Sequence, residues 1–142
     1  MTIAAILGGK GQDVITTTGE RTVREAVALL SERRIGAVPV IEDGAVVGIF
    51  SERDVIHCLE REGAVALDKP VREVMTAPAI TVDRRESVLG ALSLMTQRRV
   101  RHLPVVENGN LLGFVSIGDL VKYRIERIEA EANELRAYIQ SA

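Results

Sequence analysis

Two serine–aspartate pairs carry the clearest candidate chemistry in the sequence. Ser51 precedes Asp54 by three residues, and Ser116 precedes Asp119 at the same spacing, each after a short apolar run. At a helix start, the serine hydroxyl can accept a hydrogen bond from a first-turn amide, and the carboxylate lies at the positive end of the helix dipole. The same carboxylate can accept hydrogen bonds from the two hydroxyls of a ribose. The pattern therefore fits helix capping and nucleoside binding alike.

Patterns typical of catalysis are weak. Both serines stand in G-x-x-S, which differs from the G-x-S-x-G turn of serine hydrolases, and neither has an evident base nearby in the sequence. His57 and Cys58 are adjacent but have no second cluster that would complete a metal site. An enzyme stays a second hypothesis, which nucleotide turnover would reveal. We expect no catalytic residues and no metal.

The chain repeats itself at a constant offset of 65 residues, from residues 15–58 to residues 80–123. The matched positions are spread over the whole unit: Ile15 and Ile80, Thr16 and Thr81, Pro39 and Pro104, Gly48 and Gly113, Ser51 and Ser116, Asp54 and Asp119. Two copies of such a unit usually pack about a pseudo-twofold axis, because neither half can bury its apolar face by itself.

Each copy predicts elements in the order β-α-β-β-α, which is an α/β (α+β) fold. The first copy predicts a strand at 14–17, a capped helix from Thr22 to about 34, hairpin strands at 37–41 and 46–50, and a helix from Ser51 to about 61. The second copy predicts a strand at 80–82, a helix from Ser87, hairpin strands at 103–106 and 111–115, and a helix from Ser116. Pro39 favours a strand that is short or lies at a sheet edge.

These elements predict four segments. They are a first repeat at 8–62, a linker with a short helix at 63–78, a second repeat at 79–124, and an extended C-terminal helix at 118–142. Before them, residues 1–12 read as an apolar lead-in followed by Gly-Gly-Lys-Gly. That run lacks the spacing of a Walker loop, so we expect a plain loop there.

The C-terminal helix carries a heptad pattern. Its apolar residues are spaced 4, 3, 4, 3 and 4 apart: Val121, Ile125, Ile128, Ala132, Leu135 and Ile139. Charged residues flank this seam, as in a coiled coil. A lone amphipathic extension is marginal in water, so we expect it to pack against a second chain as a homodimer. The alternative is that it folds back on its own module.

Composition limits the remaining classes. The 142 residues are 46% hydrophobic and 27% charged, with a net charge of −2 and 3% aromatic residues, so we do not expect nucleic-acid binding. One cysteine, Cys58, is compatible with a reducing cytosol, and we expect it to be a small buried residue. No apolar run approaches membrane-spanning length, and we expect a cytoplasmic protein.

Four stretches carry a resemblance to a known family: residues 48–54 (GIFSERD), residues 113–119 (GFVSIGD), the hairpin strands around Pro39 and Pro104, and the linker residues 71–76 (VREVMT). The chain resembles a tandem pair of CBS domains, also called a Bateman module, over nearly its whole length. It looks like a stand-alone pair without an attached enzyme or transporter. The resemblance implies two CBS repeats related by a pseudo-twofold axis.

Members of that family bind adenosine-containing ligands between the repeats, namely AMP, ADP, ATP, NAD or S-adenosylmethionine, and usually dimerise. Carried over, Asp54 and Asp119 would hold ribose hydroxyls, with Ser51 and Ser116 near the ribose and phosphate. The adenine would be flanked by Ile15, Thr16, Ile80, Thr81 and the backbone before Pro39 and Pro104.

The two copies differ where phosphate would bind. Arg101 and His102 in the second copy replace Gly36 and Ala37, whereas Arg53 in the first copy replaces Gly118. Guanidinium and imidazolium groups suit phosphate oxygens. We expect the site with Asp119, Arg101 and His102 to prefer a phosphorylated adenosine. The Asp54 site would then take its phosphate contacts from Arg53 or from no side chain at all. Two sites of unequal affinity and one site that stays empty are the two alternatives.

The function indicated is a non-catalytic regulatory module that senses an adenine nucleotide. The alternative is a protein-interaction module that regulates a partner enzyme with little or no ligand dependence.

Overall fold

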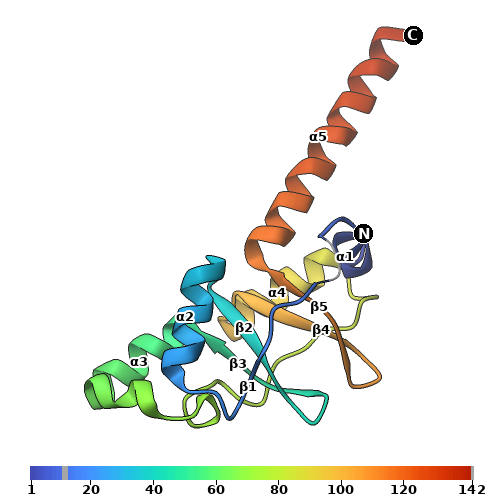
Figure 1. Cartoon of the computed structure of the whole chain (residues 1–142). Coiled ribbons are helices and arrows are strands. Elements are labelled where there is room, and N and C mark those ends of the chain that lie inside the picture. The colour runs from blue at the N-terminus through green and yellow to red at the C-terminus, as the bar shows by residue number, and fades with distance from the viewer. Residues whose placement is uncertain (11–12, 142) are drawn as a thin grey trace.

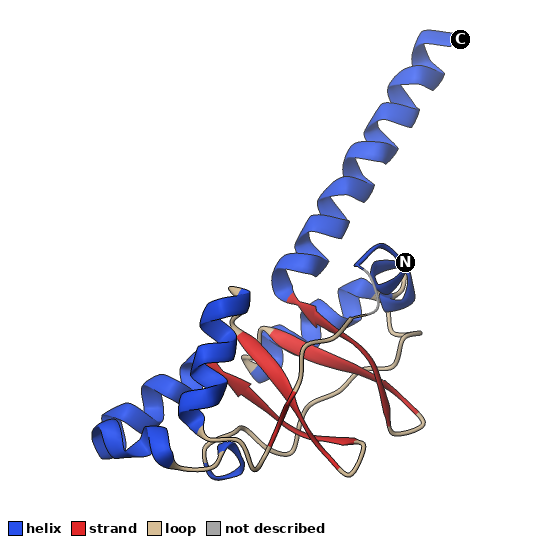
Figure 2. Cartoon of the chain, viewed as in Figure 1, coloured by secondary structure: helices blue, strands red, loops and turns tan. Residues whose placement is uncertain are grey.

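The computed structural model describes residues 1–10 and 13–141 of the chain. Two units of similar build lie side by side, and a long helix projects away from them (Figure 1). Each unit has a small sheet with helices packed against it (Figure 2), and the two sheets contact each other through β3 and β5. Over the described ranges, none of the helices combines the length and apolar character needed to span a bilayer.

The first repeat contains β1 (Thr17–Thr18), α2 (Val23–Arg33), β2 (Ala37–Glu42), β3 (Ala45–Ser51) and α3 (Glu52–Glu62). The sheet order is β1-β2-β3, with β1 parallel to β2 and β2 antiparallel to β3. The hairpin turns at Asp43 and Gly44, which have φ of 50° and 79°. Two positive φ values match the twist of the flanking strands, as the Asp-Gly pair predicts.

The capping box predicted at the start of α2 is confirmed. The Thr22 hydroxyl accepts from the Glu25 amide at 3.1 Å, and the Glu25 carboxylate accepts from the Thr22 amide at 3.3 Å. Arg21 also donates to this carboxylate at 2.8 Å. Together, the Arg21 guanidinium and the Thr22 donors lower the pKa of Glu25, which keeps the cap charged.

The second repeat contains α4 (Val88–Arg98), β4 (His102–Glu107), β5 (Asn110–Ser116) and α5 (Ile117–Ser141). β4 and β5 form an antiparallel hairpin in the same register as β2 and β3. The strand predicted at 80–82 is reduced to one parallel bridge, in which Val82 donates to Pro104 and accepts from Val106. The prediction of a full strand there was wrong.

Proline explains why both first strands are short. The strand predicted at 14–17 is observed as Thr17–Thr18, paired with Val40 and Ile41. Extending either parallel ladder toward its N-terminus would need an N–H donor at Pro39 or Pro104, which proline lacks. β2 is nevertheless the middle strand of its sheet, so an edge position for the strand with Pro39 was wrong, and β2 spans six residues. The N–H that Pro39 lacks would have pointed toward β1, but the pairing of β1 with β2 covers only Val40 and Ile41.

The N-terminal segment also departs from expectation. Residues predicted as a lead-in and a loop form α1 (Ile3–Lys10), whereas Gly11 lies outside the described residues. α1 packs on the second repeat: Ile3 and Ile6 are 0% and 6% exposed in its core. The Ile3 amide donates to Glu86 and the Ala4 amide to Arg84, each at 2.9 Å. Glycines in this run therefore do not prevent a helix that gains tertiary contacts.

Each repeat has its own hydrophobic core. The first core is formed by Val23, Ala26, Leu30, Val38, Val40, Phe50, Cys58, Ala66 and Val71. The second core is formed by Ile3, Ile6, Val82, Val88, Ala91, Met95, Leu103, Val105, Val115 and Leu120. Cys58 is buried, as predicted.

The linker docks on the first repeat as two short 3₁₀ helices, η1 (Gly63–Asp68) and η2 (Val71–Glu73), with Pro70 at the start of η2. Ala66 and Val71 are fully buried in the first core. Thr76 then forms an antiparallel bridge with Ile49, through two backbone hydrogen bonds of 2.9 Å. The linker is thus a structural part of the first repeat.

Candidate functional site

The predicted serine–aspartate pairs both cap helices. The Ser51 amide donates to Asp54 at 2.8 Å, and the Asp54 amide donates to the Ser51 hydroxyl at 3.4 Å. In the second repeat, the Ser116 amide donates to Asp119 at 2.8 Å, and the Asp119 amide donates back at 3.1 Å. Capping uses one oxygen of each carboxylate and holds the start of each helix in place.

The environments of the two aspartates differ. Asp54 is 9% exposed, and its second oxygen accepts a 2.8 Å hydrogen bond from the Thr76 hydroxyl of the linker. It lines a cavity of about 300 Å³ together with His57, Cys58 and Met75. Asp119 is half-buried and lines a separate cleft. Asp54 therefore holds the linker, a contact that no local sequence pattern predicts.

We expect Asp54→Ala to lower the free energy of unfolding by about 2–4 kcal/mol, because both a cap and a buried hydrogen bond to a charged group are lost. Thr76→Val removes the second contact while the cap stays, so its cost should be about half as large or less. Urea denaturation of the two variants measures this difference. Equal losses in both would contradict the assignment of a separate capping contribution.

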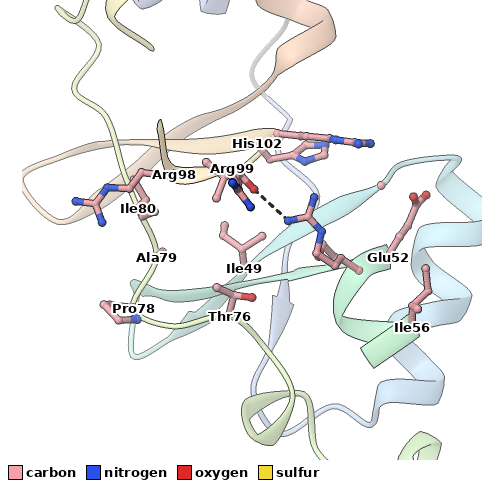
Figure 3. A pocket seen from close by; sticks show the side chains of 15 residues that line it. Ile49, Glu52, Ile56, Thr76, Pro78, Ala79, Ile80, Arg98, Arg99 and His102 are labelled. Atoms are coloured by element: carbon pink, nitrogen blue, oxygen red, sulfur yellow. Dashed lines mark hydrogen bonds between the residues drawn. The ribbon is translucent and has the colours of Figure 1, made fainter. Parts of the chain in front are cut away.

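The first cleft lies between the repeats and has a volume of about 480 Å³. It is lined by Gly36, Ile49, Ser51, Glu52, Arg53, Ile56, Thr76, Pro78, Ala79, Ile80, Arg98, Arg99, Val100, Arg101 and His102. In Figure 3, Thr76 and Ile49 lie on the first-repeat side, while Arg98, Arg99 and His102 line the facing side. The cleft combines apolar walls with a positively charged rim.

Arginines dominate the charge of this cleft. Four of its lining residues are arginines, whereas Glu52 is the one carboxylate among the described residues that line it. Arg53 reaches across the gap, where its Nη1 donates to the Arg99 carbonyl at 3.1 Å (dashed line in Figure 3). Arg99 itself ends α4 in a left-handed conformation with φ of 55°. The arrangement suits a ligand with several anionic oxygens.

The second cleft has a volume of about 420 Å³, and Ser116 and Asp119 line it from the second repeat. The facing side is formed by Val14, Ile15, Arg34, Ile35, Gly36 and Ala37. His102 stacks on Phe114 here, with ring centroids 5.4 Å apart and planes inclined by 15°. This cleft is less cationic, with Arg34 as the one arginine among its described lining residues.

A sequence profile of the CBS domain matches residues 11–61 and 71–126, which together make up most of the chain. The chain belongs to the CBS domain family.

Known relatives agree with this assignment. The mitochondrial CBS domain-containing protein CBSX3 of Arabidopsis thaliana is 34% identical over 98% of this chain and 72% of its own length. The crystal structure of ATU1752 from Agrobacterium tumefaciens is 38% identical, with a TM-score of 0.84 over 87% of this chain and 99% of that one. The CBS pair of MJ0100, solved with methylthioadenosine and S-adenosyl-L-methionine, shares the fold at 24% identity, with a TM-score of 0.76 over 87% of this chain and 98% of that one.

The CBS pair groups the predicted site residues differently from our expectation. Arg101 lines the cleft that contains Ser51 and Arg53, whereas we expected it beside Asp119. The loop after each first helix crosses to the cleft of the other repeat, so Arg99 and Arg101 face Arg53, while Arg34 faces Asp119. His102 borders both clefts. Arg101 and Asp119, which we expected in one site, therefore line different clefts.

The remaining predicted residues divide between the two clefts and their surroundings. Ile80 lines the first cleft and Ile15 the second, while Pro39, Pro104, Thr16 and Thr81 line neither. Both prolines are buried within their strands. Arg98 and Arg99 line the first cleft, although positive charge at the end of α4 would also offset the helix dipole. Thr76, Val14 and Phe114 line the clefts as well and were not predicted. No group of three or more potential metal ligands occurs within the part of the chain that the structure describes.

Proposed function

We propose that this CBS pair is a non-catalytic regulatory module that binds an adenosine nucleotide, and that the phosphates enter the first cleft. The observation that carries the proposal is the set of four arginines around one cleft between the repeats. Guanidinium groups recognise phosphate through paired hydrogen bonds, whereas a neutral ligand would leave this charge uncompensated.

The shape and polarity of the first cleft support the same ligand class. Ile49, Ile80 and Val100 provide apolar walls that suit the face of an adenine, and Ser51 supplies a hydroxyl near the arginines. The MJ0100 pair, which has the same fold, was solved with two adenosine-containing ligands. AMP, ADP, ATP and NAD combine an adenosine with phosphate and are the candidates we favour.

The second cleft supports a further adenosine site of lower phosphate affinity. Asp119 and Ser116 lie on one side of it, and Ile15 lies on the other. In this proposal Asp119 accepts from the ribose hydroxyls. Asp54 is not among the residues that line the first cleft. We therefore assign the binding of the ribose hydroxyls to Asp119 and not to Asp54.

Thermal unfolding of nucleotide-stripped protein tests the proposal directly. A ligand at about 100 times its dissociation constant stabilises the folded state by about 2.7 kcal/mol, which raises the midpoint by roughly 5–10 °C for a domain of this size. We expect a rise with at least one of AMP, ADP, ATP and NAD. No rise with any of them or with S-adenosylmethionine would favour the alternative, a module that regulates a partner protein without a ligand.

A matched pair of arginine variants identifies the cleft used. Arg98 lines the first cleft, whereas its repeat counterpart Arg33 lines neither cleft. Both are exposed residues in the last turn of their helices. Arg98→Ala should weaken nucleotide binding about 10-fold, which corresponds to about 1.4 kcal/mol, while Arg33→Ala should leave it unchanged. Isothermal titration measures both, and equal effects would argue against the first cleft.

We also propose that the module works as a homodimer in the cytoplasm. The exposed apolar seam of α5 supports association of two chains, and the buried thiol of Cys58 suits a reducing compartment. Gel filtration and cell fractionation test these two points.

A further inference from the structure

The helix α5 leaves the body of the molecule and continues well beyond it (Figure 1). Leu120 is its buried contact with the second core. Further along, its large apolar side chains are exposed: Ile125 by 49%, Ile128 by 48%, Leu135 by 59% and Ile139 by 64%. A helix with such a stripe is marginal by itself in water and gains stability when the stripe is covered.

The stripe has the heptad spacing of a coiled coil. Its residues assign Ile125, Ala132 and Ile139 to heptad position a, and Val121, Ile128 and Leu135 to position d. Isoleucine fills two of the three a positions, and leucine fills one d position beside Val121 and Ile128. Apolar residues at a and d form the seam through which coiled-coil helices pair. The same surface on a second copy would therefore cover the seam.

The charges beside the seam select the orientation of the two helices. Position g holds Arg124 and Glu131, and position e holds Glu129 and Arg136. In a parallel coiled coil, each g residue faces the e residue five positions later in the other helix. Arg124 would then face Glu129 of the partner subunit, and Glu131 would face Arg136 of the partner subunit. Both pairs are of opposite charge.

The opposite orientation is unfavourable. When two α5 helices overlap fully in an antiparallel sense, Glu129 meets Glu129 of the partner subunit and Glu131 meets Glu131 of the partner subunit. Lys122 then meets Arg136 of the partner subunit. Like charges at these positions disfavour pairing.

We propose that α5 pairs with α5 of a second copy of this chain as a parallel, in-register, two-stranded coiled coil. The pairing is argued from exposure, heptad spacing and charge complementarity; it rests on the homodimer proposed above and adds the contact and its orientation. It places the two bodies at the same end of the coiled coil, so that both pairs of clefts lie near its base.

Sedimentation equilibrium of the full chain tests the seam with a matched pair of variants. Ile128→Asp puts a charge at the centre of the seam, whereas Ala130→Asp puts it on the outer face of the same helix. We expect a wild-type dimer, a dimer dissociation constant at least about 100-fold higher in Ile128→Asp, and a change of less than about threefold in Ala130→Asp. A monomeric wild type, or equal behaviour of the two variants, would overturn the proposal.

Cross-linking and charge exchange test the orientation. Under oxidation, Ile139→Cys should give a covalent dimer and Ala137→Cys should not, because only the seam positions face each other in a parallel pair. Arg136→Glu should weaken the dimer about tenfold, and adding Glu131→Arg should restore most of the loss. Absence of the Ile139→Cys cross-link in a protein that still dimerises would exclude the parallel arrangement.

Discussion

Replacing Ile3 with alanine should lower the free energy of unfolding by about 2–5 kcal/mol, although the residue lies near the start of the chain. Ile3 is fully buried in the core of the second repeat, whose other buried members, apart from Ile6, begin at Val82. Its amide also ties α1 to Glu86. Removing the side chain leaves a cavity that the neighbouring strands and helix can fill in part at best.

The matched control is Ile56→Ala, because Ile56 is 65% exposed on α3. Its truncation should change the free energy of unfolding by less than about 0.5 kcal/mol. Guanidinium denaturation of both variants, followed by circular dichroism, measures the difference. If Ile3→Ala were as mild as Ile56→Ala, α1 would not be part of the second core.

Gly48→Ala should be the more damaging of two equivalent glycine substitutions, at a cost of about 2–3 kcal/mol. A Cβ at Gly48 would lie 2.8 Å from the Thr76 carbonyl oxygen and 2.7 Å from the Met75 sulfur. The carbonyl is fixed, because it accepts from the Ile49 amide at 2.9 Å. The linker would have to move away from the edge of β3. The hydrogen bond from the Thr76 hydroxyl to Asp54 would then be lost as well.

The repeat supplies the control at Gly113, where an added Cβ would overlap the tip of the Leu7 side chain. A half-buried leucine tip can rotate away, whereas a backbone carbonyl in a bridge cannot, so Gly113→Ala should cost less than half as much. Denaturation midpoints measure both costs. Faster hydrogen exchange of the Thr76 amide is expected in Gly48→Ala alone, and its absence would show that the linker stays in place.

Local features were the part of the fold that the sequence predicted well. The capping boxes at Thr22 and Ser51 and the Asp-Gly hairpin depend on residues within a few positions of one another. The 65-residue repeat then extended these local features to a second copy. Such signals are strong because the backbone satisfies them without reference to the rest of the chain.

Features that depend on how the two repeats pack could not be predicted. Arg101 belongs with Arg53 because each loop crosses to the opposite repeat, and no local pattern encodes that crossing. Asp54 looked equivalent to Asp119, yet the linker brings the Thr76 hydroxyl to Asp54 from 22 positions further along the chain. The burial of Ile3 likewise depends on partners far away in the sequence.

The position of α1 has a consequence for the order in which the molecule folds. During synthesis, residues 3–10 leave the ribosome before residues 84–120, against which they pack. The first repeat can form its own core around Phe50 as soon as its linker is available, while α1 still exposes Ile3 and Ile6. The second repeat completes its core only when α1 packs against it. The helix that is synthesised first is therefore among the last to be buried.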